Sequence, residues 1–122
     1  MEIGAQLFTL RNFCTNLSDF SETLKKVADI GYKTVQVSGV CPYEPQWLAD
    51  QLKKNGLKCV LTHTDKARMH EMPETVAAEH DIFGCDYIVS SVGEAHLEDK
   101  AVASNEVVAE HIKGFLPYLE KY

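Results

Sequence analysis

The sequence has no long hydrophobic run, no block of basic residues and no closely spaced cysteine pair. A membrane-spanning helix needs about 20 consecutive apolar residues, and because no segment approaches this length we expect no membrane partner. The formal net charge is −6, and without a basic block the chain is poorly suited to a nucleic-acid backbone, so we expect no nucleic-acid partner. The first residues, MEIGAQLF, lack the pattern of a secretory signal and suit the start of a strand.

The four cysteines show neither a C-x-x-C motif nor the spacing of a zinc site. Two of them, Cys59 and Cys85, border or lie in segments that we predict to be buried strands. A free cysteine packs there as a small hydrophobic residue. We therefore predict reduced thiols and a cytoplasmic protein. The chain also lacks a phosphate-binding glycine loop, a nucleophile elbow and an HExxH motif.

A helix–glycine–strand pattern is present and occurs three times. In LKKVADIGYKTVQVSG, Gly31 separates the end of an amphipathic helix from a β-branched strand, and a glycine is typical after a helix because it adopts the left-handed conformation. Gly56 and Gly84 stand at the same point of the next two units, at intervals of 25 and 28 residues. Repetition at this period is typical of alternating strands and helices, which form a parallel sheet.

The predicted elements follow from this repeat. The strands are expected at Ile3–Leu10, Thr34–Ser38, Lys58–Thr64 and Asp86–Val92. The helices are expected to begin at Ser18 as N-cap, at Pro45, at Pro73 and at Ser104 or Asn105, with Pro117 kinking the last one. The third strand is a continuous apolar run, which suits a strand covered on both faces.

We predict one α/β domain over residues 1–122, with four strands and four helices in strict alternation. Right-handed connections place every helix on one face of a sequentially ordered parallel sheet. Such a sheet curls towards a barrel, but eight strands are needed to close one. Because an open curl exposes its inner apolar face and its edges, we expect self-association, such as a homodimer.

Polar residues cluster at or near the predicted strand ends, where chemistry takes place in this class of fold. They are Gln6, Thr9, Arg11, Gln36, Ser38, Thr62, His63, Asp65, Ser90, Ser91 and Glu94. His63 is the strongest candidate, because an imidazole there can bind a hydroxyl, ligate a metal or move a proton. A histidine that only satisfies neighbouring backbone groups is the other interpretation. The remaining histidines, at 70, 80, 96 and 111, are predicted to lie on the surface.

Three further residues are candidates for ligand binding. Gln6 and Gln36 fall in strands among apolar residues, where an unpaired amide is costly. We expect these amides to bond each other or a ligand, and a purely structural pair is equally compatible with the sequence. Arg11 follows the first strand and offers a bidentate cation, either for an anionic group or for a neighbouring acid.

Three stretches, IGAQLFTLR, LKKVADIGYKTVQVSG and LKKNGLKCVLTH, together resemble the xylose isomerase-like TIM-barrel family, the sugar phosphate isomerases/epimerases. The resemblance covers nearly the whole chain. Family members are (βα)8 barrels of about twice this length. The resemblance therefore implies the (βα)4 N-terminal half of such a barrel, with helices on its outer face.

The resemblance also implies chemistry. Family enzymes hold a divalent metal (Mn, Mg, Zn or Co) at the ends of the last four strands and move protons through a metal-stabilised ene-diolate. Those strands are missing here, so no metal ligand carries over and no catalytic residue is assigned. His63 matches the family's substrate-side histidine, and Gln6 matches the polar residue of the first strand. Gln36 stands where the family pattern has Glu, and a neutral amide cannot act as a base.

Three hypotheses follow from the resemblance. The first is part of a metal-dependent isomerase or epimerase acting on a sugar or polyol, inactive as this chain alone. The second is a non-catalytic half-barrel that self-associates and binds a small polyol. The third is an endonuclease-type member of the same superfamily, and the net charge of −6 argues against it. We rank them in this order.

Overall fold

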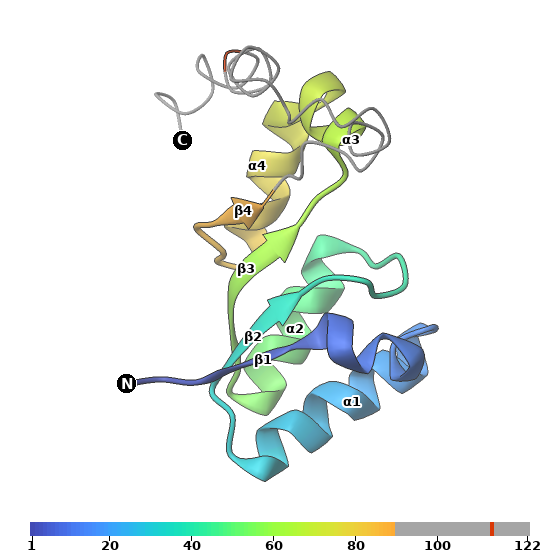
Figure 1. Cartoon of the computed structure of the whole chain (residues 1–122), viewed down its shortest axis with the longest axis vertical. Helices are drawn as coiled ribbons and strands as arrows, with labels where there is room; N and C mark the ends of the chain where they lie inside the picture. Colours follow the sequence, from blue (N-terminus) through green and yellow to red (C-terminus); the bar gives the residue numbers. More distant parts are fainter. Residues whose placement is uncertain (90–112, 114–122) are drawn as a thin grey trace, which may run out of the picture. The chain divides into compact units, whose positions relative to one another are not determined.

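The computed structural model describes residues 1–89 and residue 113. The described residues fall into two compact units, the first of residues 1–63 and 79–89, the second of residues 64–78 and 113 (Figure 1). Each unit is described by itself. The single domain expected over residues 1–122 stays a prediction.

The first unit contains a four-stranded parallel sheet. Its strands are β1 (Gly4–Gln6), β2 (Thr34–Val37), β3 (Lys58–His63) and β4 (Ile88–Val89). They lie side by side in the order of the sequence, and each neighbouring pair is parallel. The predicted α/β fold with a sequential parallel sheet is confirmed. Residues 90–92 of the predicted fourth strand lie outside the described residues.

The first strand is shorter than predicted. Strand β1 ends at Gln6, and a 3-10 helix, η1 (Leu7–Phe13), replaces the second half of the expected strand Ile3–Leu10. The buried Leu7 and the half-buried Leu10 are three residues apart, which suits a helix of three residues per turn. The Thr9 hydroxyl also donates to the Gln6 carbonyl at 2.6 Å, a local bond that competes with strand pairing.

Helix α1 (Leu17–Ile30) begins two residues earlier than a cap at Ser18 implies. Asn16 is its N-cap, and the Asn16 side chain accepts a hydrogen bond from the Asp19 backbone N–H at 2.9 Å. The predicted Ser18 cap is therefore wrong; both residue types cap well, and the chain uses the first. At the other end Gly31 has φ +118°, which confirms the predicted left-handed stop.

Helix α2 (Pro45–Asn55) begins with Pro45 in its first turn, as predicted. Gly56 ends it in the left-handed conformation, and Gly84 adopts the same conformation before β4. The repeated glycines thus end the helices before the next strands, as their spacing indicates.

The connection after β3 contains one helix that the sequence analysis missed. Helix α3 (Lys66–Glu71) has Asp65 as its N-cap, and the Asp65 carboxylate accepts from the Arg68 backbone N–H at 3.2 Å. Helix α4 (Pro73–Ile82) begins at Pro73, as predicted. The predicted last helix lies outside the described residues, apart from Lys113, which is helical and exposed.

One face of the sheet, here called the covered face, packs against α1 and α2. Its strand residues are buried: Ala5, Val35, Val37, Cys59 and Thr62. They share one hydrophobic core with the buried side chains of the two helices. Phe20 of α1 is the largest fully buried side chain, and its ring lies 5.3 Å from that of Trp47 between ring centres. Helices therefore cover the sheet on the side that the connections require.

The opposite face, here called the open face, carries Gln6, Gln36, Val60 and His63. Each directly follows a residue of the covered face, and successive side chains in a strand point to opposite faces. Three of them are exposed and Gln36 is half-buried. The expectation that the third strand is covered on both faces is wrong for the described residues, because burial along β3 is discontinuous and Val60 is 36% exposed.

His80 is a second correction. Its predicted surface position is wrong, because the side chain is only 5% exposed. The His80 ring reaches the covered face of β3, where its Nε2 lies 2.6 Å from the Thr62 hydroxyl. It also packs on Phe83, with 4.8 Å between ring centres. The helical spacing of His80 and Phe83 indicates this shared side.

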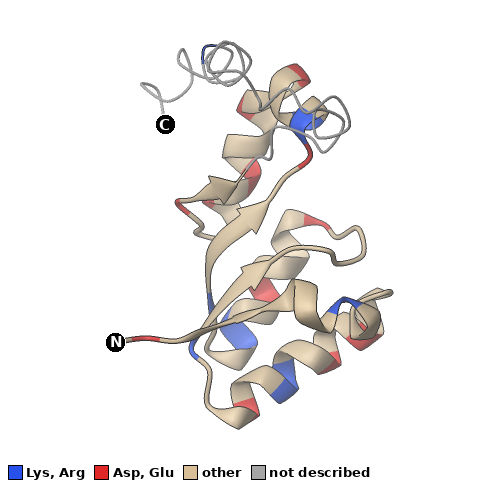
Figure 2. Ribbon diagram, viewed as in Figure 1, with Lys and Arg blue, Asp and Glu red and all other residues tan. Residues whose placement is uncertain are grey.

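Charged residues are distributed over the helices and loops more than over the strands (Figure 2). Both signs are interspersed along α1, where Lys26 lies 3.4 Å from Glu22. Such exposed pairs contribute little to stability. Within the part of the chain that the structure describes, no helix is long and apolar enough to cross a membrane.

Candidate functional site

Three of the four predicted binding residues lie at the carboxyl ends of neighbouring strands. Gln6 is the last residue of β1, and the strand register pairs it with Gln36 of β2. His63 is the last residue of β3. Parallel strands end at the same edge of a sheet, so the sequence pattern placed these residues in one region. Ser90, Ser91 and Glu94 lie outside the described residues.

The side chains of Gln36 and His63 are in direct contact. The Gln36 Nε2 atom lies 3.0 Å from the His63 Nδ1 atom. The sequence predicts that the Gln36 amide bonds Gln6 or a ligand, and it gives no signal for His63 as the partner. The two residues are 27 apart in sequence, so only the pairing of β2 with β3 reveals the contact.

An irregularity in the sheet makes this contact possible. Val35 pairs with Cys59, but Gln36 pairs with Leu61, so Val60 is an extra residue on β3. A bulge of this kind changes the direction in which the following side chains point. Because the register resumes at Leu61, His63 lies on the same face as Gln36.

The contact fixes which groups remain available to a ligand. When the imidazole is neutral and carries its proton on Nε2, the Gln36 amide donates to Nδ1. Among the residues that the structure describes, the Nε2–H of His63 and the carbonyl oxygen of the Gln36 amide then have no other partner on the open face. A donor next to an acceptor matches the hydroxyl groups of a sugar or polyol.

Among the described residues, Arg11 contacts its own 3-10 helix and pairs with no acid. Its guanidinium donates to the Phe8 carbonyl at 2.9 Å and lies 4.4 Å from the centre of the Phe8 ring. Both residues belong to η1, so the cation is held by its own helix. The stem of Arg11 and the Phe8 ring pack close to Gly39, whose φ is +66°. A Cβ at Gly39 would approach the Phe8 ring to 2.7 Å, so this position requires glycine.

Ser38 is one of the predicted strand-end polar residues. It follows β2 and is 4% exposed, and its hydroxyl has no hydrogen-bond partner among the described residues. Leaving a buried hydroxyl unpaired costs about 1–3 kcal/mol. The sequence gives no signal for this, because a serine at a strand end is ordinarily exposed.

The described residues do not assemble a metal site. No group of three or more His, Cys, Asp or Glu side chains is close enough to hold an ion within this part of the chain. His63 has an amide neighbour, and an amide nitrogen is not a metal ligand. The divalent metal expected for a full-length family enzyme therefore stays a prediction.

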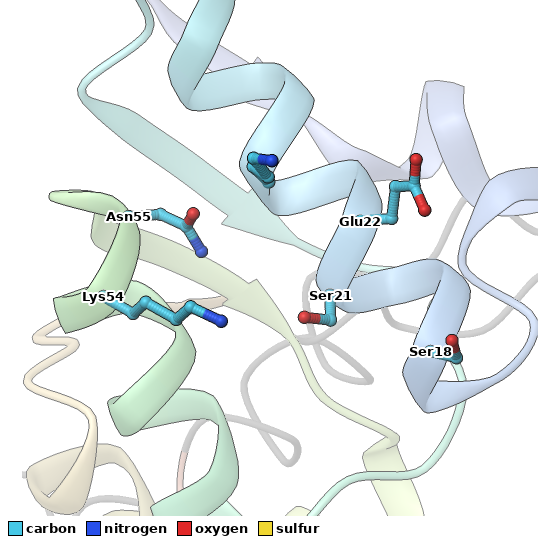
Figure 3. A pocket seen from close by; sticks show the side chains of 6 residues that line it. Ser18, Ser21, Glu22, Lys54 and Asn55 are labelled. Atoms are coloured by element: carbon cyan, nitrogen blue, oxygen red, sulfur yellow. The ribbon is translucent and has the colours of Figure 1, made fainter.

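A polar surface pocket of about 280 Å³ lies between α1 and α2 (Figure 3). Its lining residues are Ser18, Ser21, Glu22, Lys25, Lys54 and Asn55. The hydroxyl of Ser21, one of these residues, donates to the Gln51 side-chain oxygen at 2.6 Å and so links α1 to α2. The pocket lies among the helices that pack against the covered face, away from the strand ends, so it is not part of the candidate site.

Comparisons with known proteins show the fold of this chain. No protein-family model and no curated protein sequence matches it. A sugar phosphate isomerase/epimerase from Parabacteroides distasonis matches it in structure with a TM-score of 0.58 and 21% identity, over 73% of this chain and 40% of that one. A probable 3-DHS dehydratase, AsbF, from Bacillus anthracis matches with a TM-score of 0.55 and 14% identity, over 77% and 39% of the two chains.

These neighbours are both TIM-barrel enzymes of the xylose isomerase-like kind. The chain spans about 40% of the length of the solved structures that it matches. At these identities the likeness concerns the fold. The resemblance inferred from the three sequence stretches is confirmed at the level of the fold: the chain has the α/β fold of part of a TIM barrel, as in these two solved structures.

Proposed function

We propose that the open face binds a small hydroxylated ligand, a sugar or polyol, through Gln36 and His63, as part of an isomerase- or epimerase-type barrel. The observation that supports this proposal is the 3.0 Å contact between the two side chains at the carboxyl edge of the sheet. Ligands of barrel folds bind at this edge. Gln6, which ends the neighbouring strand, is in reach of the same ligand through the register of β1 with β2.

In this proposal the described residues hold the substrate and do not transfer its proton. The Gln36 amide neither gains nor loses a proton near neutral pH, so it orients His63 and accepts a hydrogen bond from a ligand hydroxyl. The His63 Nε2–H donates to a second ligand oxygen. A divalent metal and the bases for proton transfer belong to strands beyond these four, and the chain alone is inactive. Arg11 is proposed to bind an anionic group of the ligand only after release from Phe8.

NMR titration of isotope-labelled protein with D-xylose, D-fructose and sorbitol tests the proposal. We expect saturable shifts of the Gln36 side-chain amide and the His63 ring with millimolar affinity, which corresponds to about 4 kcal/mol. His63→Ala removes a hydrogen bond worth about 1 kcal/mol and should weaken binding about fivefold. His70→Ala is the matched control, because His70 is also exposed but lies on α3. Equal affinity of the two variants, or no saturable shift, contradicts the proposal.

A second proposal is a non-catalytic half-barrel that self-associates and binds a polyol. The observation in its favour is Val60 on the open face, an apolar side chain that is 36% exposed. Two copies of a four-stranded sheet together provide the eight strands that a closed barrel needs. Light scattering should give the molar mass of a homodimer at micromolar concentration. A stable, well-folded monomer there contradicts this second proposal and leaves the ligand-binding proposal intact.

A further inference from the structure

Two of the free cysteines occupy equivalent positions on neighbouring segments of the sheet. Thr62 of β3 pairs with Ile88 of β4. Cys59 precedes the first of these partners by three residues, and Cys85 precedes the second by three. Neighbouring strands lie about 4.8 Å apart, and a disulfide bridges Cα separations of about 4.4–6.8 Å. The equal offsets from a paired position therefore make Cys59 and Cys85 candidates for a bridge between β3 and the segment before β4.

Both side chains belong to one hydrophobic core. Each thiol also shifts the pKa of the other: Cys59 lowers the pKa of Cys85, and Cys85 raises that of Cys59. Each thiol also donates to the carbonyl two residues further on, at 3.5 Å for Cys59 and Leu61 and at 3.3 Å for Cys85 and Tyr87. The same local geometry therefore holds both side chains in the core, where Cys59 is 0% and Cys85 is 4% exposed.

We propose that Cys59 and Cys85 are a modification site, a dithiol that a small disulfide of the glutathione class oxidises reversibly to an intramolecular disulfide. The product links β3 to the segment that leads into β4. Because β3 ends at His63, oxidation would fix the register of the strand that carries the candidate binding histidine. The proposal rests on the sheet geometry and is independent of the proposed function.

The reaction proceeds by two thiol–disulfide exchanges. The Cys85 thiolate attacks one sulfur of the small disulfide, forms a mixed disulfide and releases one small thiolate. The Cys59 sulfur then loses its proton, attacks the Cys85 sulfur and displaces the second small thiolate. The two protein thiols are oxidised, the small disulfide is reduced to two thiols, and the two protons end on these products. Interaction with the Cys59 thiol lowers the pKa of the Cys85 thiol to about 7, so Cys85 is the attacking group.

Cys85 also has a route to the reagent. It precedes β4 in the segment 84–87, in which its three neighbours Gly84, Asp86 and Tyr87 are exposed. Strand β4 has two residues in the described part of the chain, and its ladder to β3 is short. Such a segment opens locally at low free-energy cost, whereas Cys59 lies within a six-residue strand.

The experiment treats the native 122-residue protein with oxidised glutathione, blocks the remaining thiols and maps the tryptic peptides by mass spectrometry. We expect loss of two of the four thiols, a mass lower by two hydrogen atoms, and one linked pair of peptides, 59–66 with 69–100. Dithiothreitol should reverse all three changes. Trypsin places each cysteine on a different peptide, so the pairing is read directly.

Cys41 and Cys14 provide the competing pair, because the Cys41 backbone N–H donates to the Cys14 carbonyl at 2.8 Å. Cys41→Ala should leave the link between 59 and 85 unchanged, whereas Cys85→Ala should abolish it. If a variant does not fold, peptide mapping of the oxidised wild-type protein alone shows which cysteines are linked. Retention of all four thiols, a link between Cys14 and Cys41 only, or a persistent mixed disulfide at Cys85 overturns the proposal.

Discussion

The covered face and the open face of the sheet are made by the same strands, yet they differ in every respect that matters for function. On the covered face, Val35 and Cys59 are fully buried against the helices. On the open face, their successors Gln36 and Val60 are half-buried and 36% exposed. Consecutive residues of one strand therefore differ in what they do: one side chain packs in the core, and the next lies on the open face, where we propose that a ligand binds.

This difference explains how a small chain keeps chemical groups at its surface. Burial of apolar side chains contributes most of the stability of a domain, and here the covered face supplies it. On the open face Gln6 and His63 are exposed and Gln36 is half-buried, which suits the recognition proposed for them. We therefore expect substitutions on the covered face to affect stability and substitutions on the open face to affect binding.

The largest expected effect follows from Phe20→Ala in the core beneath the covered face. Phe20 is 0% exposed and packs against the rings of Tyr43 and Trp47. Its truncation leaves a cavity and should lower the free energy of unfolding by about 3–5 kcal/mol, measured by chemical denaturation. The matched control is Phe13→Ala, because Phe13 is 65% exposed and should change stability by less than about 0.5 kcal/mol. Similar losses in both variants would mean that the core is not where the structure places it.

An intermediate effect distinguishes the two faces directly. Val35→Thr places a hydroxyl in the core, where nothing replaces its bonds to water, and should cost about 1–3 kcal/mol. Val60→Thr adds the same hydroxyl on the open face, where water reaches it, and should cost less than about 0.5 kcal/mol. Thermal unfolding of the two variants measures the contrast. A large loss for Val60→Thr would show that the open face is covered in solution, as the self-association proposal requires.

The sequence predicted the parallel sheet well, because its signals are local and repeated. Gly31, Gly56 and Gly84 each end a helix-to-strand unit, and all three adopt the left-handed conformation that their positions indicate. The errors occur where two local patterns compete. The segment after Gln6 is apolar enough for a strand, but its three-residue spacing and the Thr9 bond favour a 3-10 helix.

The candidate site was predictable in its residues but not in its contacts. Strand ends gave Gln6, Gln36 and His63 from the sequence alone. The Gln36–His63 contact depends on the bulge at Val60, and a bulge arises from the pairing of two strands, which no local pattern encodes. The buried Ser38 hydroxyl was not foreseeable for the same reason.

The smallest expected effect tests whether the Gln36–His63 contact is structural or available to a ligand. A double-mutant cycle compares Gln36→Ala, His63→Ala and the combined variant by chemical denaturation. Between a half-buried and an exposed side chain, water replaces the bond in each single variant. The coupling should therefore be about 0.5 kcal/mol, at the low end for a protein hydrogen bond.

A matched cycle exists on α2, where the Gln46 Nε2 donates to Asp50 at 3.0 Å on the surface of the helix. We expect its coupling to be similarly small, about 0.3 kcal/mol. A coupling above about 2 kcal/mol for Gln36 and His63 would instead identify a structural pair, because a hydrogen bond of that strength stabilises the fold and a ligand could break it only at a high free-energy cost. If the coupling is as small as that of the surface pair, breaking the Gln36–His63 hydrogen bond costs little free energy. Ligand hydroxyls can then replace that bond, as binding on the open face requires.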